Sequence, residues 1–179
     1  MEQHKPVKDL DKKKEAFARA LGVMQTLRSD CPWDAKQNNE SIRQNTIEET
    51  YELAEALIKG DAKEIQKECG DVLEQIFFYA MFAEEKGQFD MGDICNAMCD
   101  KLVFRHPHVF GNESGKSLTA KEIADTSELV KAKEKDGNKT IMSGIPKTMP
   151  AVLKALSMQE KARGCGFDWG EKEDVWDKV

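Results

Sequence analysis

Acidic side chains gather in two neighbouring stretches of this sequence, and their spacing groups them in pairs. Glu49 and Glu52 are three residues apart, as are Glu68 and Asp71. In a helix, residues at this spacing point from the same side, so each pair forms one acidic face. Four carboxylates that converge repel one another unless a cation neutralises them. Oxygen ligands without histidine or cysteine suit Mg²⁺ or Mn²⁺ better than zinc or copper, and such a site favours phosphoryl or nucleotidyl chemistry.

An apolar stripe accompanies each acidic pair at helical spacing. The first stripe comprises Ile47, Tyr51, Ala54, Leu57 and Ile58, and the second comprises Ile65, Cys69, Val72 and Ile76. Glu49 falls between apolar positions because Leu53 lies beyond it, whereas Glu68 falls beside its stripe and Asp71 further round. Runs of acids are also common on solvated helix faces, which is the plain alternative for any one glutamate. Two pairs that border apolar stripes favour the metal site.

Two cations follow near the end of a later helix. Lys101 and Arg105 are four residues apart and therefore share one helix face. They are suited to binding the oxygens of a triphosphate, Arg105 in bidentate fashion. The alternative is that they only complement the helix dipole. His106 and His108 flank a proline and are interpreted as residues that pack the turn or support the metal site from behind, rather than as metal ligands.

The elements that must position these residues are helices. Apolar spacing predicts helices over residues 8–29, 41–59 and 62–86, and a fourth from residue 90 or 92 to 105. Pro32 disfavours helical geometry at Cys31, and Gly60 is suited to a left-handed cap before a tight turn. The sequence contains no alternating run of β-branched residues of the kind that forms a sheet. We therefore expect an all-α fold.

The chain changes in character after residue 110. We expect a catalytic helical domain over residues 1–111 and a linker with a short helix (128–134) over residues 112–147. Apolar helical spacing resumes in residues 148–179, which form the predicted C-terminal helical segment.

Composition excludes several classes of protein. The 179 residues carry a formal net charge of −6, so a broad electrostatic hold on nucleic acid is not expected. The longest apolar run, residues 76–83, is too short to cross a membrane. The N-terminal residues show no secretory signal, and five cysteines at unpatterned spacing are typical of reduced thiols. A cytoplasmic location is therefore expected.

Four segments, taken in order, resemble the MazG nucleoside triphosphate pyrophosphohydrolases. They are Cys31-Pro32-Trp33-Asp34, Glu48-Glu49-Thr50-Tyr51-Glu52, Glu68-Cys69-Gly70-Asp71 and the run from Lys101 to Phe110 that contains Arg105-His106-Pro107-His108. The resemblance covers about residues 15–111. The tail from Ile145 to Trp169 looks like the linker and opening helix of a second domain in longer members, although only one copy of the acidic motif is present here.

This resemblance implies an all-α helical bundle of the MazG type that packs as an intertwined homodimer or a higher homo-oligomer. It also implies Mg²⁺-dependent hydrolysis of standard or non-standard nucleoside triphosphates to monophosphate and pyrophosphate, which clears the nucleotide pool. The metal ligands of the family fall on Glu49, Glu52, Glu68 and Asp71. The catalytic positions fall on Glu48, Glu49 and Glu52, with Glu48 a candidate for orienting water or a second metal. The substrate-binding positions fall on Glu48, Lys101, Arg105 and Trp169.

Two other functions are alternatives to this one. A carboxylate-bridged di-iron bundle needs Glu-x-x-His on two helices, and the acidic stretches supply no histidine. A non-enzymatic helical dimerisation module with solvated acidic faces is the stronger alternative, and it predicts no tight binding of Mg²⁺.

Overall fold

The computed structural model describes residues 5–111, 118–119, 122–123, 130 and 141–167. Every regular element within these ranges is helical, which confirms the all-α prediction. The chain divides into two compact units, Met1–Cys99 and Asp100–Val179, and each is described here by itself. The predicted domain limits at residues 111 and 147 stay a prediction.

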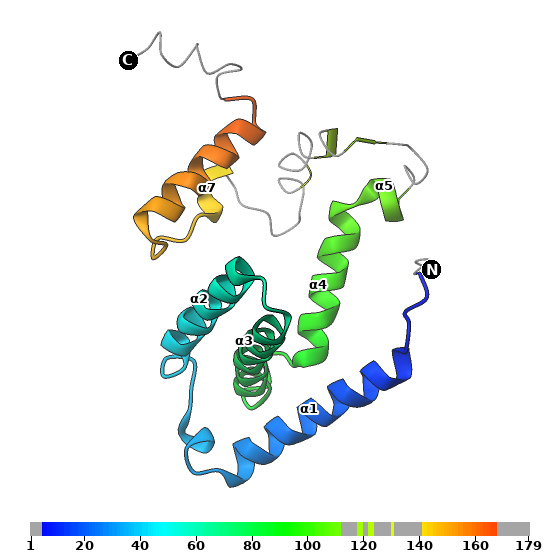
Figure 1. Cartoon of the computed structure of the whole chain (residues 1–179), viewed down its shortest axis with the longest axis vertical. Helices are drawn as coiled ribbons and strands as arrows, with labels where there is room; N and C mark the ends of the chain where they lie inside the picture. Colours follow the sequence, from blue (N-terminus) through cyan, green and yellow to red (C-terminus); the bar gives the residue numbers. More distant parts are fainter. Residues whose placement is uncertain (1–4, 112–117, 120–121, 124–129, 131–140, 168–179) are drawn as a thin grey trace. The chain divides into compact units, whose positions relative to one another are not determined.

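The observed helices begin and end within two residues or so of the predicted limits (Figure 1). The first unit contains α1 (Leu10–Asp30), η1 (Asp34–Lys36), α2 (Arg43–Lys59) and α3 (Ala62–Glu84). Helix α4 (Met91–Arg105) continues into the second unit, which also contains α5 (Pro107–Phe110), η2 (Ile141–Gly144) and α7 (Ala151–Gly164). The short helix predicted over residues 128–134 lies outside the described residues, apart from residue 130.

Local chemistry explains where the helices of the first unit end. Cys31 is extended, with φ −90° and ψ 118°, because the following proline disfavours helical geometry there. Gly60 ends α2 in the left-handed region, at φ 72°, which glycine adopts without steric cost. Asp61 then caps α3, since its carboxylate accepts hydrogen bonds from the backbone N–H groups of Lys63 and Glu64. Helices α2 and α3 are thus joined by two residues.

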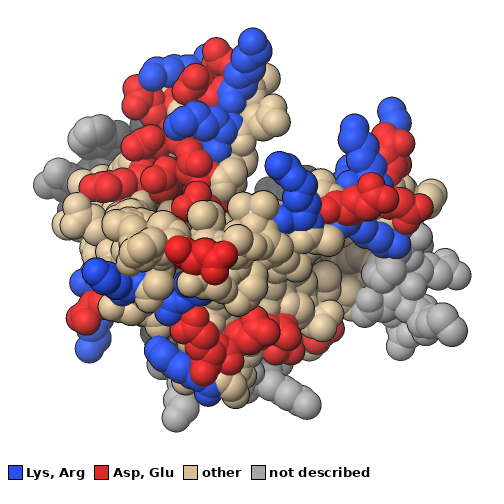
Figure 2. Space-filling model, turned by 90° about the horizontal axis from the view of Figure 1, so that it is seen from below, with Lys and Arg blue, Asp and Glu red and all other residues tan. Residues whose placement is uncertain are grey.

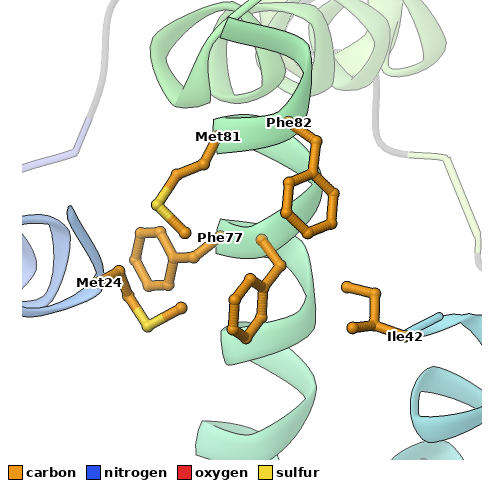
Figure 3. Packing of buried hydrophobic residues seen from close by; sticks show 6 residues of the cluster. Met24, Ile42, Phe77, Met81 and Phe82 are labelled. Atoms are coloured by element: carbon orange, nitrogen blue, oxygen red, sulfur yellow. The ribbon is translucent and has the colours of Figure 1, made fainter. Parts of the chain in front are cut away.

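The hydrophobic core lies around the second half of α3. It consists of Met24, Ile42, Phe77, Phe78, Met81 and Phe82, all of them buried. Figure 3 shows Met24 of α1 and Ile42, just before α2, approaching α3 from opposite sides. Helix α3 is therefore the central element of the first unit, and it holds α1 and the start of α2 in place.

Helices α2 and α3 form an antiparallel hairpin, which contains the most extensive packing between helices. The Thr46 hydroxyl, near the start of α2, is 2.5 Å from the Tyr79 hydroxyl near the end of α3. Ala56 is the buried residue of α2 at the other end of the hairpin. The face of α2 that includes Thr46 and Ala56 therefore packs on α3.

The apolar stripe predicted on α2 is not the face that packs within the chain. Its large side chains, Ile47, Tyr51, Leu57 and Ile58, are all more than half exposed, and Ile58 reaches 86%. The stripe is exposed because α3 packs on a different face of α2, the one that includes Ala56. The stripe is left as an open apolar surface of the first unit.

Other surface features agree with the composition. None of the helices that the structure describes combines the length and the apolar character needed to span a membrane. On the face drawn in Figure 2, the described Lys and Arg side chains lie among Asp and Glu rather than forming a continuous basic surface. All five cysteines are free thiols, as expected.

Candidate metal centre

Three of the predicted ligands converge on the α2–α3 hairpin. One carboxylate oxygen from each of Glu49, Glu68 and Asp71 lies within 4.8 Å of the other two. Glu68 and Asp71 are one turn apart on α3, and Glu49 comes from the facing side of α2. The antiparallel hairpin therefore produces the convergence that the spacing predicted. We refer to these three residues as the carboxylate cluster.

Glu68 is the most buried member of the carboxylate cluster, with only 4% of its surface exposed. Its Oε1 atom accepts a hydrogen bond of 2.8 Å from Lys67 Nζ, whereas its Oε2 atom is buried without a hydrogen-bond partner. The spacing placed Glu68 beside the apolar stripe of α3 but did not predict that it is more buried than the members of that stripe. A buried carboxylate oxygen without a partner is costly, so this position fits a bound cation.

The other two members of the cluster, Glu49 and Asp71, are half-buried. Burial raises the pKa of Glu49 above its ordinary value of 4.5, and the negative charges of Glu52, Asp71 and Glu68 raise it further. The positive charge of Lys67 acts in the opposite direction. Mutual repulsion of this kind is the electrostatic signature of a site that a divalent cation would stabilise.

Glu49 should make the metal-free protein less stable as the pH rises. Because its pKa is raised in the folded state, the native protein binds more protons than the unfolded chain just above pH 4.5. The free energy of unfolding therefore falls as the pH rises from 4.5 through the raised pKa. We expect Glu49→Gln to lack this loss and to gain stability relative to wild type over that interval. Thermal unfolding in EDTA at a series of pH values tests this, and a difference independent of pH would contradict it.

Glu52 and Glu48 lie beside the cluster rather than in it. Glu52 is exposed and lines a polar cavity of about 320 Å³ next to Glu68. The remaining lining residues of this cavity are Glu55, Ala56, Lys59 and Glu64. Glu48 is exposed, and its Oε1 atom accepts a hydrogen bond of 3.0 Å from the Gln44 side chain. Their assignment as a ligand and as a catalytic residue stays a prediction.

Lys67 is a charged neighbour of the cluster that the sequence reading missed. Its ammonium group lies 2.8 Å from Glu68 Oε1 and 3.4 Å from Asp71 Oδ2. Hydrogen bonds to these two carboxylates raise its pKa above the ordinary value. The spacing of four residues between Lys67 and Asp71 was the available signal, since oppositely charged residues at this spacing meet on a helix.

Apart from Glu48 on α2, the predicted substrate-binding residues belong to the second unit. Lys101 is exposed and Arg105 half-buried, one turn apart at the end of α4. His106 Nδ1 lies 2.6 Å from the Leu102 carbonyl oxygen, and the His106 and His108 rings lie 5.6 Å apart at a tilt of 58°, so both histidines pack in the turn. Trp169 lies outside the described residues. The role of Lys101, Arg105 and Trp169 toward a substrate stays a prediction.

Comparison with known proteins identifies the segment that carries the cluster. Residues 37–110 match the family described as the MazG nucleotide pyrophosphohydrolase domain. The chain is 39% identical over 166 residues to the nucleoside triphosphate pyrophosphohydrolase of Escherichia coli K12, and this match covers 90% of the chain and 62% of the relative. It is 40% identical over 166 residues to the nucleoside triphosphate pyrophosphohydrolase/pyrophosphatase MazG of Thermotoga maritima, covering 91% and 63%. The chain thus spans about three fifths of the length of these curated relatives.

A solved structure supports the fold. The crystal structure of a mazG-related protein from Thermotoga maritima aligns with a TM-score of 0.55 at 24% identity, covering 65% of this chain and 99% of that one. Helices α2, α3 and α4 and the carboxylate cluster lie within the segment that matches the family model. Residues 37–110, which contain the carboxylate cluster, are therefore similar to the MazG nucleotide pyrophosphohydrolase domain.

Proposed function

We propose that this protein is a Mg²⁺-dependent nucleoside triphosphate pyrophosphohydrolase, which produces a nucleoside monophosphate and pyrophosphate. The observation that carries the proposal is the carboxylate cluster, with its buried and unpartnered Glu68 oxygen. The names of the two relatives described above support the same activity. If the protein were only a dimerisation module, its acidic side chains would be solvated. The convergence of three carboxylates, one of them buried, favours an enzyme instead.

Glu49, Glu68 and Asp71 would hold the metal ion, together with Glu52 from the next turn of α2. Their donor atoms are all carboxylate oxygens, the ligands preferred by Mg²⁺ and Mn²⁺. When bound, such an ion neutralises charge on the phosphate chain and lowers the pKa of a water molecule. No soft ligand is part of the cluster, which argues against zinc or copper.

The chain's own residues have separate roles in the proposed reaction. Glu48 orients the attacking water and accepts its proton on a carboxylate oxygen. The water oxygen bonds to the α-phosphorus while the bond from that phosphorus to the bridging oxygen breaks, and pyrophosphate leaves with the electron pair. The resemblance assigns Lys101 and Arg105 to the charge of the leaving group and Trp169 to nucleotide binding.

The assay that tests this function measures nucleoside monophosphate, pyrophosphate and orthophosphate separately. A panel of standard, deoxy and damaged nucleoside triphosphates is incubated with the protein in Mg²⁺ and in EDTA. We expect monophosphate and pyrophosphate in equal amounts, only with the metal ion present. Release of orthophosphate with a diphosphate, or turnover in EDTA, would contradict the proposal. The panel also identifies the preferred base and sugar.

We further propose that the protein is a homodimer whose subunits meet through the apolar stripe of α2. Exposed residues of this size in one stripe mark an interaction surface, because the described part of the chain does not cover them. An apolar surface on the same helix as Glu49 would also place the two metal sites close to the subunit interface.

A charge placed in the stripe should separate the subunits. We expect Ile58→Glu to convert the protein to a monomer, since burial of a carboxylate in an apolar interface is unfavourable. Light scattering during gel filtration measures the mass, and circular dichroism checks that the helices remain. The control is Val152→Glu on α7, where an apolar residue that is 73% exposed lies outside the stripe. A wild-type mass near 20 kDa would contradict the dimer.

A further inference from the structure

Lys67 is bound to the carboxylate cluster in an uncommon way. Its ammonium group contacts Glu68, the next residue along α3, at 2.8 Å. Adjacent residues of a helix diverge by about 100° and do not normally face each other. The long Lys67 side chain therefore bends back over the cluster, where it also meets Asp71 at 3.4 Å. One cation contacts two of the three ligands.

The exposure of these side chains shows from which direction Lys67 approaches. The Lys67 side chain is 60% exposed, whereas those of Glu68 and Asp71 are 5% and 36% exposed. The ammonium group thus lies on the solvent side of the cluster and the carboxylates lie beneath it. Lys67 thus covers the Glu68 and Asp71 side of the cluster, while Glu68 also lines the polar cavity next to Glu52.

The two cations cannot share the cluster. Glu68 offers one oxygen to Lys67 and leaves the other buried and unpartnered. A divalent ion between the three carboxylates would lie within a few ångströms of the ammonium group, where like charges repel strongly. Binding of the ion therefore requires the lysine side chain to leave, and its flexible four-carbon stem permits this.

We propose that Lys67 is the resident counter-ion of the metal site: it neutralises Glu68 and Asp71 in the metal-free protein, and the divalent ion must displace it. The proposal rests on the proposed function, because it assumes that the carboxylate cluster binds a divalent ion. Lys67 then weakens metal binding and stabilises the metal-free state. It is a positioning residue of the site, not a ligand.

Metal titration of the full chain tests this proposal without relying on activity. The dissociation constant for Mn²⁺ is measured by electron paramagnetic resonance, and that for Mg²⁺ by calorimetry. We expect Lys67→Met to bind either ion about tenfold more tightly than wild type, since the competing charge is gone. Lys67→Arg keeps the charge and should bind as wild type does. Lys63→Met is the matched control, because Lys63 is an exposed lysine one turn earlier on α3 and is not a neighbour of the cluster in sequence.

Thermal unfolding gives a second readout. In EDTA, Lys67→Met should unfold at a lower temperature than wild type, because the carboxylate cluster then has no counter-ion. Added Mg²⁺ should raise its unfolding temperature by more than it raises that of wild type. Lys67→Gln serves as a second neutral variant, and both must agree.

The possible outcomes separate this proposal from the proposed function. If wild type binds the ions and Lys67→Met has the same dissociation constants as Lys63→Met, the counter-ion role is overturned while the metal site stands. If wild type and every variant bind neither ion, the metal site and the counter-ion role both fail. Tighter binding by both neutral variants, together with a larger Mg²⁺-induced stabilisation, establishes the role.

Discussion

Replacement of Asp71 by asparagine is expected to abolish tight Mg²⁺ binding and to reduce pyrophosphate release roughly a hundredfold or more. Asp71 supplies one of the three oxygens of the carboxylate cluster, and asparagine removes its charge with almost no change in shape. Since Asp71 is half-buried and lies on the solvent side of Glu68, the fold should tolerate the substitution. Turnover of a nucleoside triphosphate and calorimetric titration with Mg²⁺ measure the two effects.

Glu84→Gln is the matched control for this experiment. Glu84 is an exposed acid at the end of the same helix, on the cavity formed with Leu21 and Met91 rather than at the carboxylate cluster. It should bind Mg²⁺ and turn over substrate as wild type does. An equal loss in both variants would indicate a general effect of charge, and unchanged turnover in Asp71→Asn would remove the cluster from the mechanism.

The positions of the helices could be predicted from the sequence because local chemistry determines them. Pro32 and Gly60 act on their own neighbours, and both ended helices where the sequence indicated. The meeting of Glu49 with Asp71 also followed from local features. Two helices joined by two residues must run antiparallel, and acids one turn apart then face each other across the hairpin.

The packed face of α2 could not be predicted in this way. Periodicity identifies an apolar stripe but not the surface that covers it, and the stripe with Tyr51 and Ile58 lies open within the chain. For the same reason the burial of Glu68 was missed, because an acid on a packed helix face contradicts the usual pattern. Departures from the usual rule that acidic residues are exposed are expected at sites that bind charged groups.

Arg28 anchors the segment that connects α1 to α2. Its guanidinium group donates to both carboxylate oxygens of Glu85, at 2.6 and 2.9 Å. It also donates to the backbone carbonyls of Asp34 and Gln37, at 2.6 and 3.0 Å, and lies 4.8 Å from the centre of the Phe82 ring. One half-buried cation thus fastens the turn between the helices to the end of α3.

We expect Arg28→Met to lower the free energy of unfolding by about 3 kcal/mol, because the stem is kept while charge-assisted hydrogen bonds are lost. Urea denaturation measures this change. Hydrogen exchange should quicken at the amides of Ala35 and Gln37, whose backbone bonds close the anchored turn. Arg19→Met, an exposed arginine on α1, is the control and should cost about 0.5 kcal/mol or less. Equal losses in the two variants would show that the bonds of Arg28 contribute no more than a surface charge. A specific loss would show that the chain leading into α2, and with it the position of Glu49, depends on this cation.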